Sequence, residues 1–296
     1  MLEFIDQRNL SIDSELFMKP EYLIHKYISG NKYRKLKYNL IQLKTLKVNA
    51  LITFGGAYSN HIAAVAATGK SVGIQTIGVI RGEELENEIM NNPTLSFAQK
   101  SGMKFKFVSR SNYRLKTSEA FIEGLRNEFG DFYLIPEGGT NSLAVKGCEE
   151  ILTPNDKSFD FICCPVGTGG TISGIINSSH QNQKVIGFPA LKGGFLQEDI
   201  SKFARQTNWE LITDYHFGGY AKINTELISF INQFKAEYNI PLDPIYTGKM
   251  MYGIFDLRRK GYFPKGSKIL AIHTGGLQGI DGMNMKLKRK HLPLII

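Results

Sequence analysis

The chain has 296 residues, of which 42% are hydrophobic, and a formal net charge of +9. This length fits one large or two medium domains with a substantial core, and no apolar run approaches the roughly 20 residues of a membrane span. The N-terminal segment MLEFIDQRNL is too charged for a secretion signal, so we expect a cytoplasmic protein without a membrane partner. The basic run Lys286, Lys288, Arg289 and Lys290 is short and lacks interleaved aromatic residues. We therefore expect no nucleic-acid partner and keep a basic nucleic-acid binder only as a rival hypothesis.

Apolar runs of strand length alternate with helix-like segments through most of the chain. The expected strands, in order, are Ala50 to Phe54, Ile74 to Ile80, Phe105 to Val108, Phe132 to Ile135, Phe161 to Cys164, Val185 to Phe188 and Ile269 to His273. The expected helices between them include Tyr33 to Leu46, Asn60 to Thr68, Pro93 to Lys100 and Thr117 to Asn127. This alternation predicts an α/β protein with open, twisted parallel sheets that carry helices on both faces.

Three cysteines are present, Cys148, Cys163 and Cys164, and the last two are adjacent in the apolar run FDFICC. Their odd number and their spacing fit neither a disulfide framework nor a metal site. We expect buried thiols that pack as small hydrophobic side chains, and no bound metal.

Glycine-rich motifs follow directly after four of the expected strands. They are GGAYSNH after Phe54, PEGGTN after Ile135, GTGGT after the FICC strand and TGG after His273. In an open parallel sheet, ligands bind in the crevice beyond the carboxyl ends of the strands. We therefore expect these four turns to meet at one site.

The GTGGT motif is a candidate phosphate loop. Its residues, Gly167, Thr168, Gly169, Gly170 and Thr171, lead into an apolar helical segment, so their N–H groups can face an anion at a helix N-terminus. The same turn can equally be a tight connection without a ligand. It lacks the lysine of a P-loop and the GxGxxG spacing, which argues against nucleoside triphosphates and dinucleotides.

Lys32, in the stretch SGNKYRKL, lies far upstream of that loop. A lone lysine at the start of a basic helix is in most proteins a solvated surface charge. An imine-forming lysine combined with a phosphate-binding turn indicates pyridoxal 5'-phosphate (PLP). The reason is that the aldehyde of this cofactor needs an amine and its phosphate needs N–H donors.

The other polar motifs fit this cofactor but have simpler explanations as well. Ser59 can cap a helix and Asn60 can offer an amide to a ring oxygen, while the doubled glycine before them indicates close approach of another group. Tyr246, in DPIYTGKMMYG, can stack on a planar ring or pass on a proton. Tyr246 and His273 can equally be ordinary core residues.

Taken together and in this order, SGNKYRKL, GGAYSNH, PEGGTN, GTGGTISG, DPIYTGK and IHTGG resemble the 1-aminocyclopropane-1-carboxylate deaminase and D-cysteine desulfhydrase family. The segments extend over nearly the whole chain. Members of this family are PLP enzymes of fold type II, the tryptophan synthase β-like fold. The resemblance implies a homodimer that acts on a small amino acid.

The resemblance also implies roles for individual residues. Lys32 matches the Schiff-base lysine, and Asn60 matches the residue that bonds the phenolic oxygen of the cofactor. Ser59 matches the residue that meets the substrate carboxylate or takes part in proton transfer. Tyr246 matches the tyrosine that stacks against the ring, and Thr274 the partner of the pyridine nitrogen. The implied catalytic residues are Lys32, Ser59 and Tyr246, the implied phosphate cup is Gly167 to Thr171, and the implied substrate contacts are Ser59, Asn60, His61 and Thr247.

Two positions separate the activities within the family. Cyclopropane deaminases resemble one another in a glutamate after the YxGK tyrosine and a leucine in the final HxGG, whereas this chain has Thr247 and Thr274. Small hydroxyl residues there are desulfhydrase-like and favour β-elimination from D-cysteine or a related amino acid, with pyruvate, ammonia and hydrogen sulfide as products. The alternatives are 1-aminocyclopropane-1-carboxylate deaminase and a protein that binds PLP without turnover. The segment Lys19 to Leu23 departs from the KREDL of relatives, so N-terminal substrate contacts are expected to differ.

The family resemblance further implies two domains. Residues 1–35 and 148–296 are expected to form a large cofactor-binding domain, and residues 36–147 a small domain inserted into it. The cofactor is expected between them.

Overall fold

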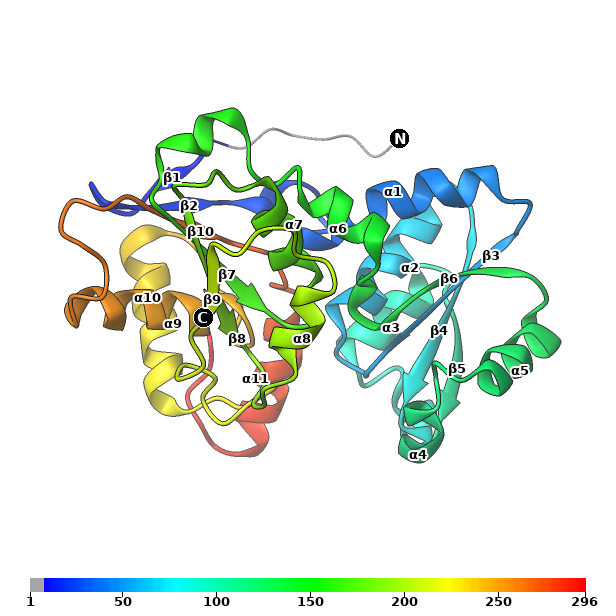
Figure 1. The fold of residues 1–296 in the computed structure, drawn as a ribbon. Coiled ribbons are helices and arrows are strands. Elements are labelled where there is room, and N and C mark those ends of the chain that lie inside the picture. The colour runs from blue at the N-terminus through cyan, green and yellow to red at the C-terminus, as the bar shows by residue number, and fades with distance from the viewer. Residues whose placement is uncertain (1–7) are drawn as a thin grey trace.

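The computed structural model describes residues 8–296, and its strands form two separate sheets (Figure 1). The larger sheet has the order β1-β2-β10-β7-β8-β9 and the smaller sheet the order β5-β4-β3-β6. All neighbouring strands are parallel except β1, which is antiparallel to β2. The strands are β1 (Leu10–Ser11), β2 (Leu16–Lys19), β3 (Ala50–Gly55), β4 (Gln75–Arg81), β5 (Lys104–Val108), β6 (Phe132–Ile135), β7 (Phe161–Val166), β8 (Lys184–Pro189), β9 (Trp209–Leu211) and β10 (Ile269–Ile272).

Helices connect most of the strands, as a parallel sheet requires. The α-helices are α1 (Asn31–Thr45), α2 (Asn60–Val72), α3 (Pro93–Lys100), α4 (Arg110–Arg114), α5 (Glu119–Phe129), α6 (Ser142–Cys148), α7 (Gly170–Ser178), α8 (Leu196–Ser201), α9 (Thr225–Tyr238), α10 (Thr247–Arg259) and α11 (Gly279–Arg289). Short 3₁₀ turns are η1 (Glu21–Leu23), η2 (Glu83–Glu88), η3 (Glu137–Gly139) and η4 (Pro154–Ser158).

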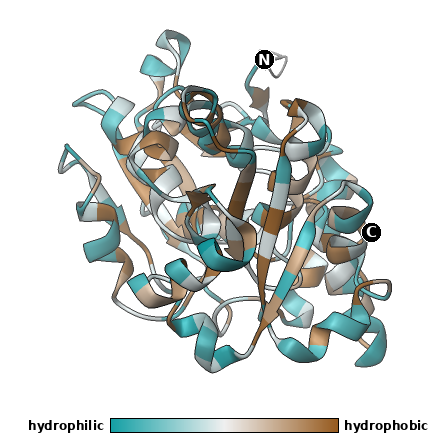
Figure 2. Cartoon of the chain, turned by 90° about the vertical axis from the view of Figure 1, so that its right-hand side faces the viewer, coloured by the Kyte–Doolittle hydropathy of each residue, from teal (hydrophilic) through white to brown (hydrophobic). Residues whose placement is uncertain are grey.

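Each sheet has a hydrophobic core on both of its faces. On the larger sheet, α9, α10 and α11 supply one core and α7 and α8 the other. On the smaller sheet, α1, α2 and α3 supply one core, and α4 and α5 pack on the opposite face. Figure 2 shows the resulting pattern, with brown, hydrophobic strands inside and teal, hydrophilic ribbon on many of the outer helices and loops. The predicted fold class, parallel sheets covered on both faces, is confirmed.

The adjacent thiols illustrate this double burial. Cys163 belongs to the core on the α10 face, and Cys164 belongs to the core on the α7 face. Successive residues of a strand point to opposite faces, so a strand with a core on each side reads as a continuous apolar run. All three cysteines are free and buried, which confirms the sequence prediction.

Two helices lie between the sheets. The first residues of α1 adjoin the end of β10, whereas Leu36, Leu40 and Leu43 belong to the core of the smaller sheet. Helix α6 packs against both α1 and α7. The domain boundaries predicted near residues 36 and 147 fall within α1 and α6, and these limits stay predictions. Within residues 8–296, no helix is long and apolar enough to cross a membrane.

Candidate active site

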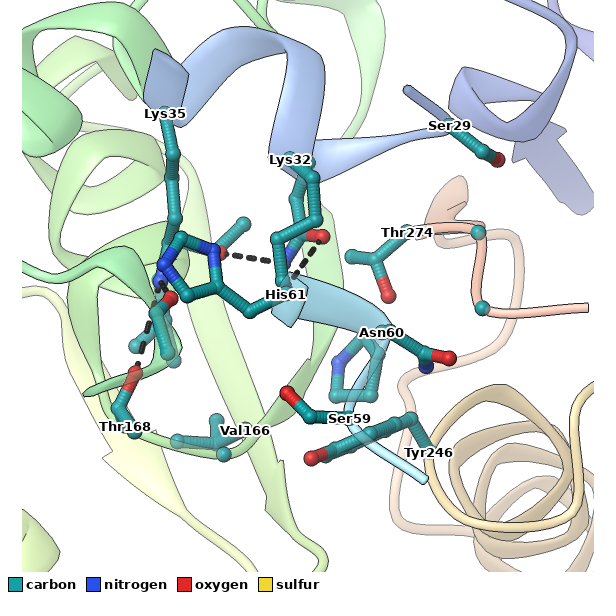
Figure 3. A pocket seen from close by; sticks show the side chains of 18 of the residues that line it. Ser29, Lys32, Lys35, Ser59, Asn60, His61, Val166, Thr168, Tyr246 and Thr274 are labelled. Atoms are coloured by element: carbon teal, nitrogen blue, oxygen red, sulfur yellow. Dashed lines mark hydrogen bonds between the residues drawn. The ribbon is translucent and has the colours of Figure 1, made fainter. Parts of the chain in front are cut away.

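A cavity of about 740 Å³, its open mouth included, lies between the two sheets. Turns that follow β3, β6, β7 and β10 all contribute to its walls, so the four predicted glycine-rich motifs do meet at one place. Of the predicted site residues, the cavity is lined by Lys32, Ser59, Asn60, His61, Gly167, Thr168, Gly169, Thr171, Tyr246 and Thr274. Figure 3 shows Lys32 entering on the side opposite Ser59 and Tyr246, with Thr274 beside it.

A close approach of two backbones sets the position of Lys32. Gly30 has a φ of 61°, and a Cβ on it would lie 2.0 Å from the carbonyl oxygen of Thr274. The N–H of Asn31 donates to that same oxygen at 3.1 Å. Only glycine combines this contact with this backbone conformation. The start of α1 is therefore fixed to the end of β10, and the next side chain points into the cavity.

The surroundings of Lys32 favour the neutral, nucleophilic form of its amine. Its Nζ donates to Asn31 Oδ1 at 3.0 Å, and Asn31 Nδ2 donates in turn to Thr171 Oγ1 at 2.8 Å. Burial, and secondarily the charge of Lys35, lower the pKa of Lys32 to about 7. At neutral pH a large fraction of this amine is uncharged, the form that attacks a carbonyl.

The phosphate-loop candidate has the expected geometry. Strand β7 ends at Val166, Gly169 has a φ of 80°, and α7 begins at Gly170 with its N-terminus at the cavity. Gly170 does not line the cavity, because its Cα packs against Thr140, where a Cβ would lie 2.7 Å from Oγ1. Gly167, Thr168, Gly169 and Thr171 of this turn line the cavity.

Lys35 is a site residue that the sequence analysis did not identify. It is 2% exposed, lines the cavity, and its Nζ donates to the Gly138 carbonyl at 2.9 Å and to Thr140 Oγ1 at 3.0 Å. Thr168 Oγ1 of the phosphate loop is 3.5 Å away. Burial lowers the pKa of Lys35. Its spacing of three from Lys32 on one helix face was the available signal.

The start of α2 presents polar groups to the cavity. Ser59 is the N-cap, and its Oγ accepts from the N–H of Ile62 at 3.3 Å. Asn60 Oδ1 is buried and has no hydrogen-bond partner among the described residues. A Cβ on Gly276 would lie 2.7 Å from Asn60 Nδ2, so this glycine lets the final TGG turn approach the amide closely. Both the unpartnered oxygen and the helix N-terminus can receive groups of a ligand.

The hydrogen bonds of His61 define its tautomer. Thr53 Oγ1 donates to the Ile135 carbonyl at 2.8 Å, so at 2.9 Å it accepts from Nε2–H of His61. Burial, with the charges of Lys32 and Lys35, holds the pKa of His61 well below its ordinary value. The ring is therefore neutral, and its Nδ1 is a buried acceptor without a partner among the described residues.

Two tyrosines form the wall opposite Lys32. The ring of Tyr246 lies against Gly167, where a Cβ would be 3.2 Å from Cε1. Tyr220, which the sequence analysis also missed, lines the cavity with its ring edge-on to Tyr246 at 6.3 Å between centroids. Burial, then the neighbouring Tyr220, raises the pKa of Tyr246 well above its ordinary value. Its hydroxyl is therefore a donor at neutral pH.

Thr247 does not face the cavity. It is fully buried, and its hydroxyl donates to the carboxylate of Asp243 at 2.7 Å and accepts from the N–H of the same residue at 2.9 Å. The predicted substrate contact of Thr247 is therefore not supported, because both functions of the hydroxyl are used within the turn that starts α10.

The charge balance of the cavity fits PLP. Its lining contains Lys32 and Lys35 but no aspartate or glutamate, so a dianion would be attracted. The phosphate loop lies at one end, and the unpartnered Asn60 Oδ1 and the Tyr246 ring lie along the wall. A lysine-based site at the strand ends of a two-sheet α/β fold defines the class of PLP enzymes of fold type II.

Comparison with known proteins gives the family. Residues 3–275 match the family model described as "Pyridoxal-phosphate dependent enzyme". A putative 1-aminocyclopropane-1-carboxylate deaminase of Pyrococcus horikoshii is 31% identical, over 94% of this chain and 89% of that protein. A mitochondrial bifunctional D-cysteine desulfhydrase/1-aminocyclopropane-1-carboxylate deaminase of Arabidopsis thaliana is also 31% identical, over 90% and 73% of the two chains. The crystal structure of an ACC deaminase homologue superimposes with a TM-score of 0.81 and 30% identity, over 93% and 88% of the chains. The chain belongs to the 1-aminocyclopropane-1-carboxylate deaminase and D-cysteine desulfhydrase family of PLP-dependent enzymes.

Proposed function

We propose that this enzyme eliminates a β-substituent from a small amino acid, with D-cysteine as the preferred substrate. The observation that carries the proposal is the Lys32 amine, whose pKa is lowered to about 7, facing Ser59 and Tyr246 across the cavity. Such an amine can both hold the cofactor and remove a proton from carbon near pH 7.

The residues that would hold PLP follow from the walls of the cavity. The turn at Gly167–Thr171 and Lys35, whose Nζ is 3.5 Å from Thr168 Oγ1, would bind the phosphate. Asn60, Thr274 and Tyr246 also line the cavity and would contact the ring oxygen, the ring nitrogen and the face of the ring, respectively, as the family resemblance implies. When bound, PLP supplies a conjugated system that spreads the negative charge left on Cα after proton removal.

The remaining groups bind and deprotonate the substrate. The N-terminus of α2 at Ser59 and Asn60 is a suitable partner for the substrate carboxylate. The Lys32 Nζ, once not engaged with the cofactor, would take the Cα proton of the bound substrate. The Tyr246 hydroxyl, which keeps its proton because its pKa is raised, then donates a hydrogen bond to the departing sulfur.

The bond changes balance with one water molecule. The Cα–H electrons form the new Cα–Cβ double bond, the Cβ–S bond breaks, and the sulfur leaves with its electron pair and takes up a proton. Hydrolysis of the remaining three-carbon fragment gives pyruvate and ammonia. D-Cysteine and water therefore yield hydrogen sulfide, pyruvate and ammonia.

The choice of D-cysteine depends on Thr274. This residue lines the cavity at the position where cyclopropane deaminases resemble one another in leucine. Thr247, the second position of that comparison, gives less support because its hydroxyl is bound to Asp243. The name of the Arabidopsis thaliana relative includes both activities, so the cyclopropane deaminase activity is the second candidate.

The decisive experiment compares two substrates with the PLP-loaded protein. Pyruvate and hydrogen sulfide from D-cysteine, at a kcat/KM well above that for 2-oxobutyrate from 1-aminocyclopropane-1-carboxylate, is the expected result. The reverse ranking supports the second candidate. Binding of PLP without keto acid from either substrate, or from a panel of L- and D-amino acids, makes the chain a PLP-binding protein without turnover.

We also propose that the enzyme acts as a homodimer in the cytoplasm, as the family resemblance implies. Sedimentation equilibrium of the PLP-loaded protein tests the first part. A single species with the 33.2 kDa mass of one chain would contradict the homodimer.

A further inference from the structure

Lys249 is a buried lysine to which the proposed reaction gives no role. It lies in the first turn of α10, is 1% exposed, and is among the largest fully buried side chains of the described residues. Burial lowers its pKa to about 8, with a smaller opposing effect of Asp243. None of the described acidic side chains forms an ion pair with it. A buried ammonium without such a pair is unfavourable unless other groups solvate it.

Two backbone carbonyls solvate this ammonium. Lys249 Nζ donates to the carbonyl of His216 at 2.8 Å and to that of Gly219 at 2.8 Å. The same two carbonyls accept from the N–H groups of Gly219 (3.0 Å) and Lys222 (3.1 Å), respectively. Lys249 therefore joins two consecutive turns, residues 216–219 and 219–222. We call residues 212–224, between β9 and α9, the Tyr220 loop.

The Tyr220 loop has an unusual backbone. Phe217 and Ala221 have φ values of 51° and 53°, and Gly218 and Gly219 have 89° and 112°. Residues other than glycine rarely adopt such φ angles, and these angles persist only where the surrounding structure imposes them. The Lys249 ammonium, bonded in the middle of this stretch, is a group that can impose them.

The loop brings Tyr220 to the cavity. Tyr220 lies within the second of the two turns, lines the cavity, and is 43% exposed, so it stands at the mouth. Tyr246, next to it, is fixed from the same helix end, because its N–H donates to the Asp243 carboxylate at 2.9 Å. Tyr246 is thus held by Asp243, just before α10, and Tyr220 by Lys249, in the first turn of that helix.

We propose that Lys249 is a positioning residue, whose buried ammonium holds the Tyr220 loop over the mouth of the cavity and so sets Tyr220 against Tyr246 for the substrate. Its effect on turnover passes through Tyr220. The kinetic part of this inference rests on the proposed function, whereas the structural part does not.

The structural test is hydrogen exchange of the protein without substrate. In Lys249→Met, whose unbranched side chain is one atom shorter than that of lysine and has no donors, amides 216–222 are expected to exchange at least about tenfold faster, as after loss of a charge-assisted hydrogen bond. Amides of β7 and β10 should be unchanged. The matched control is Lys286→Met, because Lys286 donates to the carbonyl of Ala221 in the same loop, at 3.1 Å, from an exposed position. This control should leave the exchange of 216–219 at the wild-type rate.

The kinetic test is a double-mutant cycle on D-cysteine turnover. Lys249→Met should lower kcat/KM, and Tyr220→Phe in that background should cost much less than it does in the wild-type protein. Lys249→Arg, which keeps donors and charge, should recover part of the loss. Full additivity of the two substitutions overturns the action through Tyr220.

The remaining outcomes are equally decisive. Wild-type exchange of 216–222 in Lys249→Met overturns the proposal, whether or not D-cysteine is a substrate. Lys249→Gln is the second variant, with a shorter side chain that can still donate to a carbonyl. Failure of both variants to fold also overturns the proposal, because Lys249 would then support the fold rather than the loop. If exchange rises as expected but no amino acid is turned over, the proposed function fails and the positioning role stands.

Discussion

The Lys32 amine is expected to react with PLP in a pH-dependent way. Only the neutral amine attacks the aldehyde, and burial lowers its pKa to about 7. The initial rate of covalent attachment to the PLP-free protein should therefore rise about tenfold per pH unit below pH 7 and level off above it. Stopped-flow absorbance at a series of pH values from about pH 5 to about pH 9 measures this rate.

Borohydride reduction and peptide mapping provide the control for that experiment. The label should lie on Lys32 and be absent from Lys32→Ala. The ordinary pKa of a lysine is about 10.4. A rate that continues to rise up to about pH 10 would therefore show that the pKa of the Lys32 amine is not lowered.

Lys35 should affect cofactor binding and stability in opposite directions. Lys35→Met removes the cation beside the phosphate loop, so PLP binding should weaken about ten- to a hundredfold. The same change removes a buried charge, so the PLP-free protein should melt at a higher temperature. Fluorescence titration and thermal unfolding measure the two effects. Lys37→Met is the matched control, because Lys37 lies on the same helix but binds Glu150 outside the cavity. Unchanged PLP affinity in Lys35→Met would remove this residue from the site.

At the scale of the element, Asp243 determines where α10 begins. Its carboxylate accepts from the N–H groups of Ile245, Tyr246 and Thr247, at 2.9, 2.9 and 2.8 Å. Asp243→Ala leaves these donors without their acceptor and should lower the free energy of unfolding by about 2 kcal/mol or more. Urea unfolding measures the loss. The control is Asp281→Ala, which removes an exposed carboxylate from the first turn of α11. Its free energy of unfolding should stay within about 0.5 kcal/mol of the wild-type value. An equal loss in both variants would contradict the special role of Asp243.

Most of the central strands were predictable because they are continuous apolar runs. Strand β3, for example, was predicted as Ala50 to Phe54 and is observed as Ala50–Gly55. Strands β1, β2 and β9 were not predicted, because β1 and β9 have only two or three residues and β2 has four, the last of them a lysine. Thr247 was expected to contact the substrate because the family resemblance implies that role for the residue after the YxGK tyrosine. Its side chain instead completes the local turn with Asp243, a competition that spacing alone does not reveal.

At the scale of the whole molecule, the site itself was only partly predictable. The glycine-rich turns were found because parallel strands bring their ends together. Tyr220 was missed because its loop has no regular pattern, and it reaches the cavity only through contacts such as those of Lys249, far away in sequence. Tertiary placement of this kind is visible only in the structure.

A buried ion pair connects the N-terminal strands to the rest of the larger sheet. Asp156 accepts from Lys19 at 2.5 Å and from Asn9 at 2.8 Å. Burial alone raises the pKa of Asp156, but these hydrogen bonds outweigh it and place the pKa below its ordinary value. This pair therefore stabilises the fold above the unfolded-state pKa of about 3.9 and is lost as the pH falls below it. In Asp156→Asn, the free energy of unfolding should therefore decrease less steeply as the pH is lowered. Urea unfolding midpoints from about pH 3 to pH 6 measure this dependence. A dependence as steep as that of the wild-type protein would contradict this role.

Helix α1 belongs to both halves of the molecule. Its first turn is bonded to the end of β10, and its later leucines are embedded beside the smaller sheet. A rotation of the smaller sheet relative to the larger one would therefore tilt this helix about its first turn, where Lys32 lies. Entry of substrate and alignment of the reacting nitrogen would then be mechanically linked, so that a substrate too large to let the halves close would also leave the nitrogen out of line.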